Sequence, residues 1–255
     1  MDDIKEIKDL FQFILQADDI GHDSSFGSDI IIPVYDISPE EFLAFAENAI
    51  SSGTKEGLVN ATSNLKRALD CEMDMFFECI NLKRIIDKNN LKFARKTQFL
   101  ADIGLFPIES INKLNLMRNK LEHEYKIPEI SDLLIYYELV WSKVKILDLH
   151  PELLYINGEI NLELYIKNNE YYFTMQHDVK ECKFKFEVID RTKGNENLTK
   201  QLNVHLKDLN DACDFIKAFN FYLFSMQYFN NGNIDLYKKK IRNLYKNFEL
   251  NHMWL

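Results

Sequence analysis

The spacing of apolar residues divides the chain into a helical first part and a mixed second part. Up to about residue 150, apolar side chains recur at intervals of three and four, which is typical of helices with one buried face. Ser38 and Pro39, followed by two acidic residues, mark a helix start, and Gly104 marks a helix end. The pattern predicts helices over residues 3–17, 38–51, 57–87, 89–103, 108–125 and 128–149.

After His150 and Pro151 the period changes to that of strands. Polar residues alternate with apolar or aromatic ones, which predicts strands over residues 161–167, 170–176, 182–189 and 200–206. Two further helices are predicted, over residues 209–229 and 234–248. The polar residues 18–28 are predicted to form a loop. Residues 30–37 are predicted as a short extended piece that Pro33 keeps at a sheet edge or outside any sheet.

These elements predict a mainly helical α+β protein with a boundary near residue 150. Residues 1–150 are expected to form an antiparallel helical bundle, and residues 151–255 a small domain of antiparallel sheet and helices. The aromatic residues of the strands form either the core of the sheet, which their spacing favours, or an exposed platform on which bases stack. These residues are Tyr165, Tyr171, Tyr172, Phe173, Phe184 and Phe186.

Composition narrows the class of protein further. The 255 residues are 46% hydrophobic and 28% charged, as in an ordinary globular protein, and no apolar run is long enough to span a membrane. The acidic, amphipathic start is unlike a secretory signal or transit peptide, so a cytoplasmic location is expected. The 4 cysteines and 6 histidines show no metal-ligand spacing. We therefore expect free thiols, no metal and no cofactor.

The net charge of −9 is unevenly distributed along the chain. Residues 1–60 carry 13 acidic and 3 basic groups, whereas residues 81–126 carry 10 basic and 5 acidic groups, a local balance of +5. The overall acidity argues against broad binding to duplex nucleic acid, which depends on neutralising phosphates. The local positive charge is compatible either with a polyanion bound at one place or with ordinary solvent-exposed helix faces.

One segment of this basic region carries the residue types of metal-free phosphodiester chemistry. Residues 116–125 read LMRNKLEHEY and place Arg118 shortly before His123. A guanidinium can bind a phosphate and the added charge of its transition state, and an imidazole can move a proton near neutral pH. Asn119 can hold a phosphate oxygen or orient the imidazole. The chemistry indicated is cleavage of RNA by its own 2′-hydroxyl. The alternative is that these are surface or helix-capping side chains.

The spacing of these two residues raises a geometric difficulty. At about 100° per residue, Arg118 and His123 point about 140° apart on a regular helix, so one unbroken helix does not direct both at the same phosphate. Either the helix ends near His123, or the residues converge across a symmetric interface between two copies.

The sequence RNKLEHEY, at residues 118–125, resembles the Arg-x4–6-His motif of the HEPN superfamily and the Arg-x4-His-x-Tyr variant of HEPN toxins. The preceding long helical segment and the turn DIGLFP are similar to the family's context, over roughly residues 40–150. The resemblance implies a metal-independent endoribonuclease that acts as a toxin or anti-phage effector. It also implies catalytic roles for Arg118 and His123 with support from Asn119, and a homodimer whose motif helices form a composite cleft.

The resemblance to toxin–antitoxin members of the family also implies a partner and a modification site for this chain. In them a nucleotidyltransferase adenylylates the motif tyrosine, which corresponds to Tyr125. The added phosphate would occupy Arg118 and block RNA from the cleft. The alternative is that the ring of Tyr125 packs beside Leu121.

Two features depart from the family pattern. Glu122 and Glu124 flank His123, where acids repel RNA unless they face solvent or raise the pKa of the imidazole. Residues 151–255 lie beyond a minimal HEPN toxin. The second functional hypothesis is therefore a non-catalytic HEPN-like module that binds a partner protein or nucleotide within a defence or toxin–antitoxin complex.

Overall fold

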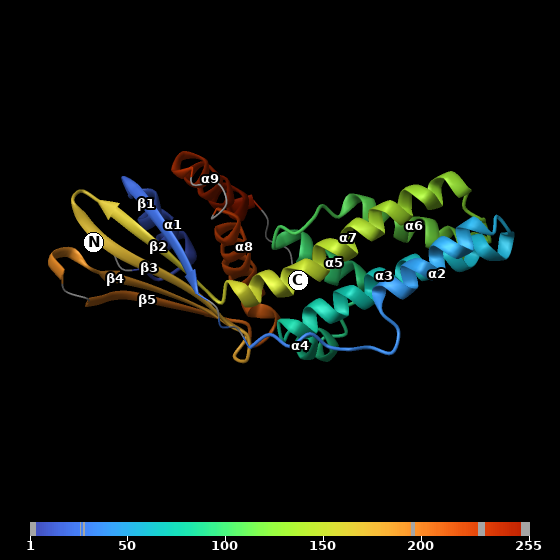
Figure 1. Cartoon of the computed structure of the whole chain (residues 1–255), viewed down its shortest axis with the longest axis horizontal. Coiled ribbons are helices and arrows are strands. Elements are labelled where there is room, and N and C mark those ends of the chain that lie inside the picture. The colour runs from blue at the N-terminus through green and yellow to red at the C-terminus, as the bar shows by residue number, and fades with distance from the viewer. Residues whose placement is uncertain (1–3, 26, 28, 195–196, 229–232, 251–255) are drawn as a thin grey trace. The chain divides into compact units, whose positions relative to one another are not determined.

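The computed structural model describes residues 4–25, 27, 29–194, 197–228 and 233–250 (Figure 1). The chain divides into two compact units, which we call the helical unit (Ile31–Glu152) and the sheet unit (Met1–Ile30 with Leu153–Leu255). The predicted α+β class, with an antiparallel sheet, is confirmed. The division at Glu152 lies close to the predicted boundary, but the first 30 residues group with the sheet unit and not with the helices.

The described part of the helical unit consists of helices joined by short connections. They are α2 (Pro39–Ser51), α3 (Lys55–Cys79), α4 (Lys83–Lys88), α5 (Phe93–Asp102), α6 (Glu109–Glu124) and α7 (Ile130–Ile156). The division between the units falls within α7, which continues through Pro151 although the sequence predicts its end near residue 149. A proline inside a helix removes one backbone hydrogen bond without necessarily ending the helix.

The helices α2 and α3 form a close antiparallel pair. Ser38 caps α2 by accepting a hydrogen bond from the Glu41 N–H (3.1 Å), as its sequence predicts. Thr54 caps α3 by accepting from the Gly57 N–H (3.0 Å). A Cβ added at Gly57 would collide with the carbonyl oxygen of Ala49, so the absence of a side chain lets the two helices approach.

The predicted single helix over residues 57–87 is wrong, because the structure divides it into α3 and α4. The break lies at Asn81, which adopts the left-handed conformation (φ 57°). The Leu82 N–H then donates to the Phe77 carbonyl at 2.8 Å, a pattern typical of a helix C-terminus. Leu82 and Ile85 are buried after the break. Asn tolerates this conformation without a glycine or proline to signal it.

The sheet unit is built on a five-stranded antiparallel sheet whose spatial order follows the chain. Its strands are β1 (Asp19–Ser25), β2 (Glu159–Ile166), β3 (Asn169–Asp178), β4 (Lys183–Asp190) and β5 (Asn197–His205). The predicted loop over residues 18–28 is wrong for residues 19–25, which form β1, and its residues 26 and 28 lie outside the described part of the chain. β1 is an edge strand that pairs only with β2, with Ile20 opposite Leu164. Because an edge strand needs few buried side chains, its sequence is polar.

Within this unit, α8 (Ala212–Tyr228) covers one face of the sheet, and α1 (Ile7–Leu15) packs beside it with Phe13 against Tyr171 of β3. The third helix, α9 (Ile234–Leu250), packs against α1 and α8. Phe173, Phe184 and Phe186 are fully buried on this face, and the ring of Phe184 lies 5.2 Å from that of Phe215 on α8. Tyr165 is 39% exposed. The phenylalanines therefore form the sheet core, as their spacing predicts, and are not available for base stacking.

Candidate functional site: the α6 motif and the α6–α7 groove

Arg118 lies in the last two turns of α6 and is partly shielded from solvent. Its guanidinium forms an ion pair with the carboxylate of Glu122, one turn further along the helix, at 2.6 Å. The side chain of Arg118 is 32% exposed. In the described structure the guanidinium is thus accessible but already neutralised by a neighbouring carboxylate.

His123 and Asn119 are exposed on another side of the same helix. Among the described residues, none forms a hydrogen bond with the His123 imidazole. The helix remains regular through Glu124, so His123 still has helical geometry. Its side chain therefore points about 140° away from Arg118. Within one copy of the chain, the structure does not bring the two predicted catalytic residues together.

Tyr125 is the C-cap of α6 and is 86% exposed. It adopts the left-handed conformation (φ 56°, ψ 28°), and its N–H donates to the Lys120 carbonyl. This conformation ends the helix and turns the side chain into solvent, so the alternative in which the ring packs beside Leu121 is wrong. A bulky residue with a left-handed backbone is uncommon, since glycine or asparagine usually occupies this position.

The two acids that flank His123 are each paired with a cation. Glu122 binds Arg118, and the Glu124 carboxylate lies 2.6 Å from the Lys126 ammonium. The hydrogen bond from Lys126 and its charge lower the pKa of Glu124. Both acids are exposed.

The structure separates the basic side chains of residues 81–126 into paired and unpaired groups. Lys96 is buried and lies between the carboxylates of Asp70 (3.0 Å) and Asp74 (2.8 Å), so it holds α5 against α3 and does not face a ligand. Lys113 and Lys120 on α6 are exposed, and no acidic group among the described residues lies within ion-pair distance of either. Part of the local positive charge therefore remains available on the motif helix.

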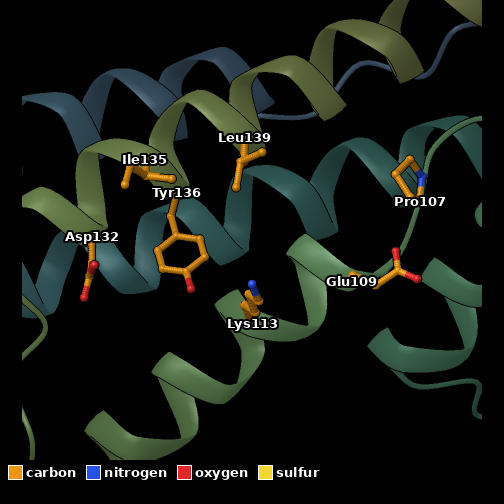
Figure 2. Close-up of a pocket in the computed structure, with 7 residues that line it drawn as sticks. All are labelled: Pro107, Glu109, Lys113, Asp132, Ile135, Tyr136 and Leu139. Atoms are coloured by element: carbon orange, nitrogen blue, oxygen red, sulfur yellow. The ribbon is translucent and has the colours of Figure 1, made fainter.

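A groove between α6 and α7 adjoins these two lysines. It has a volume of about 520 Å³ and is lined by Lys113, Leu116, Met117, Lys120, Lys126, Ile127, Pro128, Glu129, Asp132 and Tyr136. A second hollow of about 430 Å³ shares Lys113, Asp132 and Tyr136 with it and extends toward Pro107 and Leu139. Figure 2 shows Lys113 on α6 opposite Asp132 and Tyr136 on α7. The motif did not indicate this groove. Its signal in the sequence is a pair of lysines two helical turns apart, Lys113 before the motif and Lys120 within it.

Within the part of the chain that the structure describes, no three His, Cys, Asp or Glu residues gather as metal ligands. Nor does any helix there combine the length and apolar character needed to cross a membrane. Comparison with models of protein families, with curated proteins and with solved structures found no match. The resemblance of the α6 motif to HEPN proteins therefore stays a prediction that rests on the motif and its helical context.

Proposed function

We propose that this protein is a metal-independent endoribonuclease of the HEPN type, a toxin or anti-phage effector that acts as a homodimer. The observation that carries the proposal is the position of the motif. Arg118, Asn119, His123 and Tyr125 all lie on the last two turns of α6 or at its cap, and each reaches solvent. A site for a large polyanion has to be accessible in this way.

The divergence of Arg118 and His123 supports a site shared by two copies. In a two-fold symmetric dimer with facing α6 helices, Arg118 of one copy lies across the cleft from His123 of the other. Two equivalent composite sites result from this arrangement. It removes the geometric difficulty without any change in the helix.

A separate stripe of exposed apolar side chains lies on the side of α7 that points away from α6 and the groove. Ile130, Leu134 and Trp141 are 42%, 50% and 48% exposed. On a regular helix they fall within about 40° of one another, so they form one stripe. Exposed apolar side chains that gather in one place are typical of interaction surfaces.

The chemistry follows from the two side chains. His123 accepts the proton of a ribose 2′-hydroxyl, and the 2′-oxygen attacks the adjacent phosphorus. The bond from phosphorus to the 5′-oxygen breaks, and that oxygen takes up the proton that His123 accepted, relayed through water, which leaves a 2′,3′-cyclic phosphate and a 5′-hydroxyl and regenerates His123. Arg118 binds the phosphate oxygens as their negative charge increases. Asn119, next to Arg118, supplies an amide for a phosphate oxygen.

The first test is RNA cleavage in EDTA by the unmodified chain and by the Arg118→Ala and His123→Ala variants. Loss of a catalytic proton transfer lowers rates by roughly 100-fold or more, so we expect at least this loss for His123→Ala. Arg95→Ala, an exposed arginine on α5, and His205→Ala in the sheet unit are the matched controls. Equal cleavage by all variants, or cleavage that requires a metal ion, would overturn the proposal.

Mixing the two inactive variants tests the composite site. In a dimer of one Arg118→Ala and one His123→Ala chain, one site lacks both groups and the other retains both. Random pairing then restores about one quarter of the unmodified activity. Each variant alone stays inactive. No recovery on mixing would show that both groups act from the same copy.

The exposure of Tyr125 supports regulation by modification. A nucleotidyltransferase partner or antitoxin would have access to its hydroxyl, and an attached phosphate would lie close enough to compete for Arg118. The expected result is that a purified cognate nucleotidyltransferase with ATP adds AMP to the unmodified chain and not to Tyr125→Phe. Cleavage by Tyr125→Phe should then resist the transferase.

The ion pair between Arg118 and Glu122 favours a second function, that of a non-catalytic HEPN-like binding module. In this case the motif binds a partner protein or nucleotide through Arg118. The two functions differ in one result. An intact chain that leaves RNA uncut, while partner binding is lost in Arg118→Ala, supports the binding module.

A further inference from the structure

One wall of the α6–α7 groove continues along α6 to His123. Lys120 follows Lys113 by seven positions on the helix, and His123 follows Lys120 by three. At about 100° per residue they fall within an arc of about 80°, so the two lysines and the imidazole form one stripe. Leu116 belongs to the same stripe and lines the groove. This wall therefore leads to the imidazole of His123 and not to Arg118 of the same copy.

The opposite wall of the groove differs in chemistry. Tyr136 on α7 is half-buried and faces Lys113 across the groove (Figure 2). Asp132, one turn earlier, lines both parts of the groove, and Glu129 lines the larger part. Burial and then the nearby charge of Asp132 raise the pKa of the Tyr136 hydroxyl. One wall of the groove, on α6, therefore carries cations, and the opposite wall carries an aromatic ring and two carboxylates.

We propose that this groove binds a nucleotide of single-stranded RNA and leads the strand to His123. Lys113 and Lys120 bind consecutive backbone phosphates, because among the described residues no carboxylate lies within ion-pair distance of either ammonium group. The ring of Tyr136 stacks on a base. Asp132 accepts a hydrogen bond from a donor that RNA offers, either an exocyclic amine or a 2′-hydroxyl. This inference rests on the proposed ribonuclease function and adds how its substrate is held.

Charge and shape favour this occupant. A duplex would need phosphate-binding cations on a broad surface, whereas the free lysines here lie in a single row on α6. A peptide with basic side chains would be repelled by the same row, and a purely apolar ligand would leave both lysines and Asp132 desolvated without partners. The volume of about 520 Å³ lies in the range, roughly 300–1,000 Å³, of sites for small organic groups.

The experiment measures RNA binding in a chain that cannot cut. His123→Ala is combined with Lys113→Ala and Lys120→Ala, and the affinity for a fluorescently labelled single-stranded RNA is measured by anisotropy in EDTA at several salt concentrations. The control combines His123→Ala with Arg84→Ala and Lys88→Ala. These are two exposed cations one turn apart on α4 for which the described residues offer no acidic partner, so the control loses the same charge.

We expect binding by the groove variant to weaken at least tenfold, and binding by the control less than twofold. The salt dependence should also change, since each lost phosphate contact lowers the slope of log K against log salt by about 0.7. The groove variant should therefore lose about 1.4 from this slope. Tyr136→Leu should weaken binding about tenfold, whereas Tyr136→Phe, which keeps the ring, should not.

The outcomes separate this inference from the proposed function. If the groove variant binds RNA as tightly as His123→Ala alone, or if the control loses as much affinity, the groove inference is wrong even though the unmodified chain cuts RNA. If RNA binding depends on the two lysines while the unmodified chain leaves RNA uncut, the groove stands and the ribonuclease proposal fails. A chain without measurable affinity for single-stranded RNA overturns the groove inference.

Discussion

The carboxylate of Glu122 binds the guanidinium of Arg118 at 2.6 Å across one turn of α6. Any phosphate that binds Arg118 has to displace this carboxylate or share the guanidinium with it. Because an exposed pair one turn apart stabilises a helix by roughly 0.3–0.5 kcal/mol, we expect Glu122→Gln to raise kcat/KM for RNA about twofold. The increase should shrink at high salt, which screens the pair.

Glu124→Gln is the matched control for this prediction. Glu124 also lies next to His123 but pairs with Lys126 and not with Arg118. If removal of negative charge alone attracts RNA, both variants will gain equally. A gain confined to Glu122→Gln, measured by initial rates of RNA cleavage, identifies release of Arg118 as the cause.

Lys96 leads to a prediction on stability. It is buried, and its ammonium lies between Asp70 and Asp74. Burial disfavours the charged form of Asp70, but the hydrogen bond from Lys66 and the charge of Lys96 outweigh it and lower the pKa of this carboxyl. We expect Lys96→Met to reduce the free energy of unfolding by about 2 kcal/mol, because two partly buried carboxylates lose a partner. Urea unfolding measures the change.

Arg95→Met is the control for this variant, since Arg95 is the exposed neighbour of Lys96 on α5. It should change the free energy of unfolding by less than about 0.5 kcal/mol. The loss in Lys96→Met should also diminish at acid pH. A carboxyl whose pKa is lowered on folding stabilises the protein above its ordinary pKa, and that contribution disappears as the pH falls and the group is protonated. Equal losses in the two variants would contradict the assigned role of Lys96.

The pattern of apolar residues predicted the elements well where a whole face is buried. Strands β2 to β5 and helices α2, α6 and α8 lie close to their predicted ranges. Each of the two wrong predictions has a physical cause. β1 has a polar sequence because it pairs at a sheet edge with β2, a strand far away in the chain, so no local signal marks it. Asn81 ends α3 by a left-handed turn that asparagine permits but does not require.

The candidate site was predictable in its residues but not in its geometry. The motif residues could be read from the sequence, as could the angle of about 140° between Arg118 and His123 on a regular helix. The spacing of Arg118 and Glu122, four positions apart, permits their ion pair but does not fix its rotamers. The exposure of Tyr125 and the shape of the groove depend on the end of α6 and on the packing of α7, which the sequence pattern does not show.

Helix propensity favours alanine over glycine at Gly57, but the packing of α2 against α3 predicts the opposite effect on stability. In an exposed helix, replacing glycine by alanine usually stabilises the protein by about 0.5–1 kcal/mol. Here the added Cβ would meet the carbonyl oxygen of Ala49 and the hydroxyl of Ser52. We therefore expect Gly57→Ala to lower the free energy of unfolding by about 1–3 kcal/mol, as overpacking does. Thermal unfolding tests the sign, and an increase in Tm would show that α2 and α3 can separate without cost.

Glu72 on α3 leads to a prediction on pH dependence. Its side chain is 3% exposed, and burial, followed by the charges of Asp148 and Glu40, raises its pKa to about 8 against the opposing effect of Lys145. In the unfolded chain the same carboxyl ionises near 4.5. Between these two values the folded state binds the additional proton, so the contribution of Glu72 to stability falls as the pH rises.

Glu72→Gln should remove this dependence, because the amide has a similar shape and stays neutral. Below pH 4.5 the variant and the unmodified chain should have similar stability. At pH 8 the variant should be more stable by an amount on the order of 2 kcal/mol. At this pH the carboxyl of the unfolded chain is ionised in water, whereas the folded chain has either to keep the proton or to bury a carboxylate that lacks a full set of partners. Glu138→Gln, an exposed acid on α7, is the control and should leave the pH profile unchanged. Parallel profiles of unfolding free energy for all three chains between pH 5 and 9 would contradict a protonated, buried Glu72.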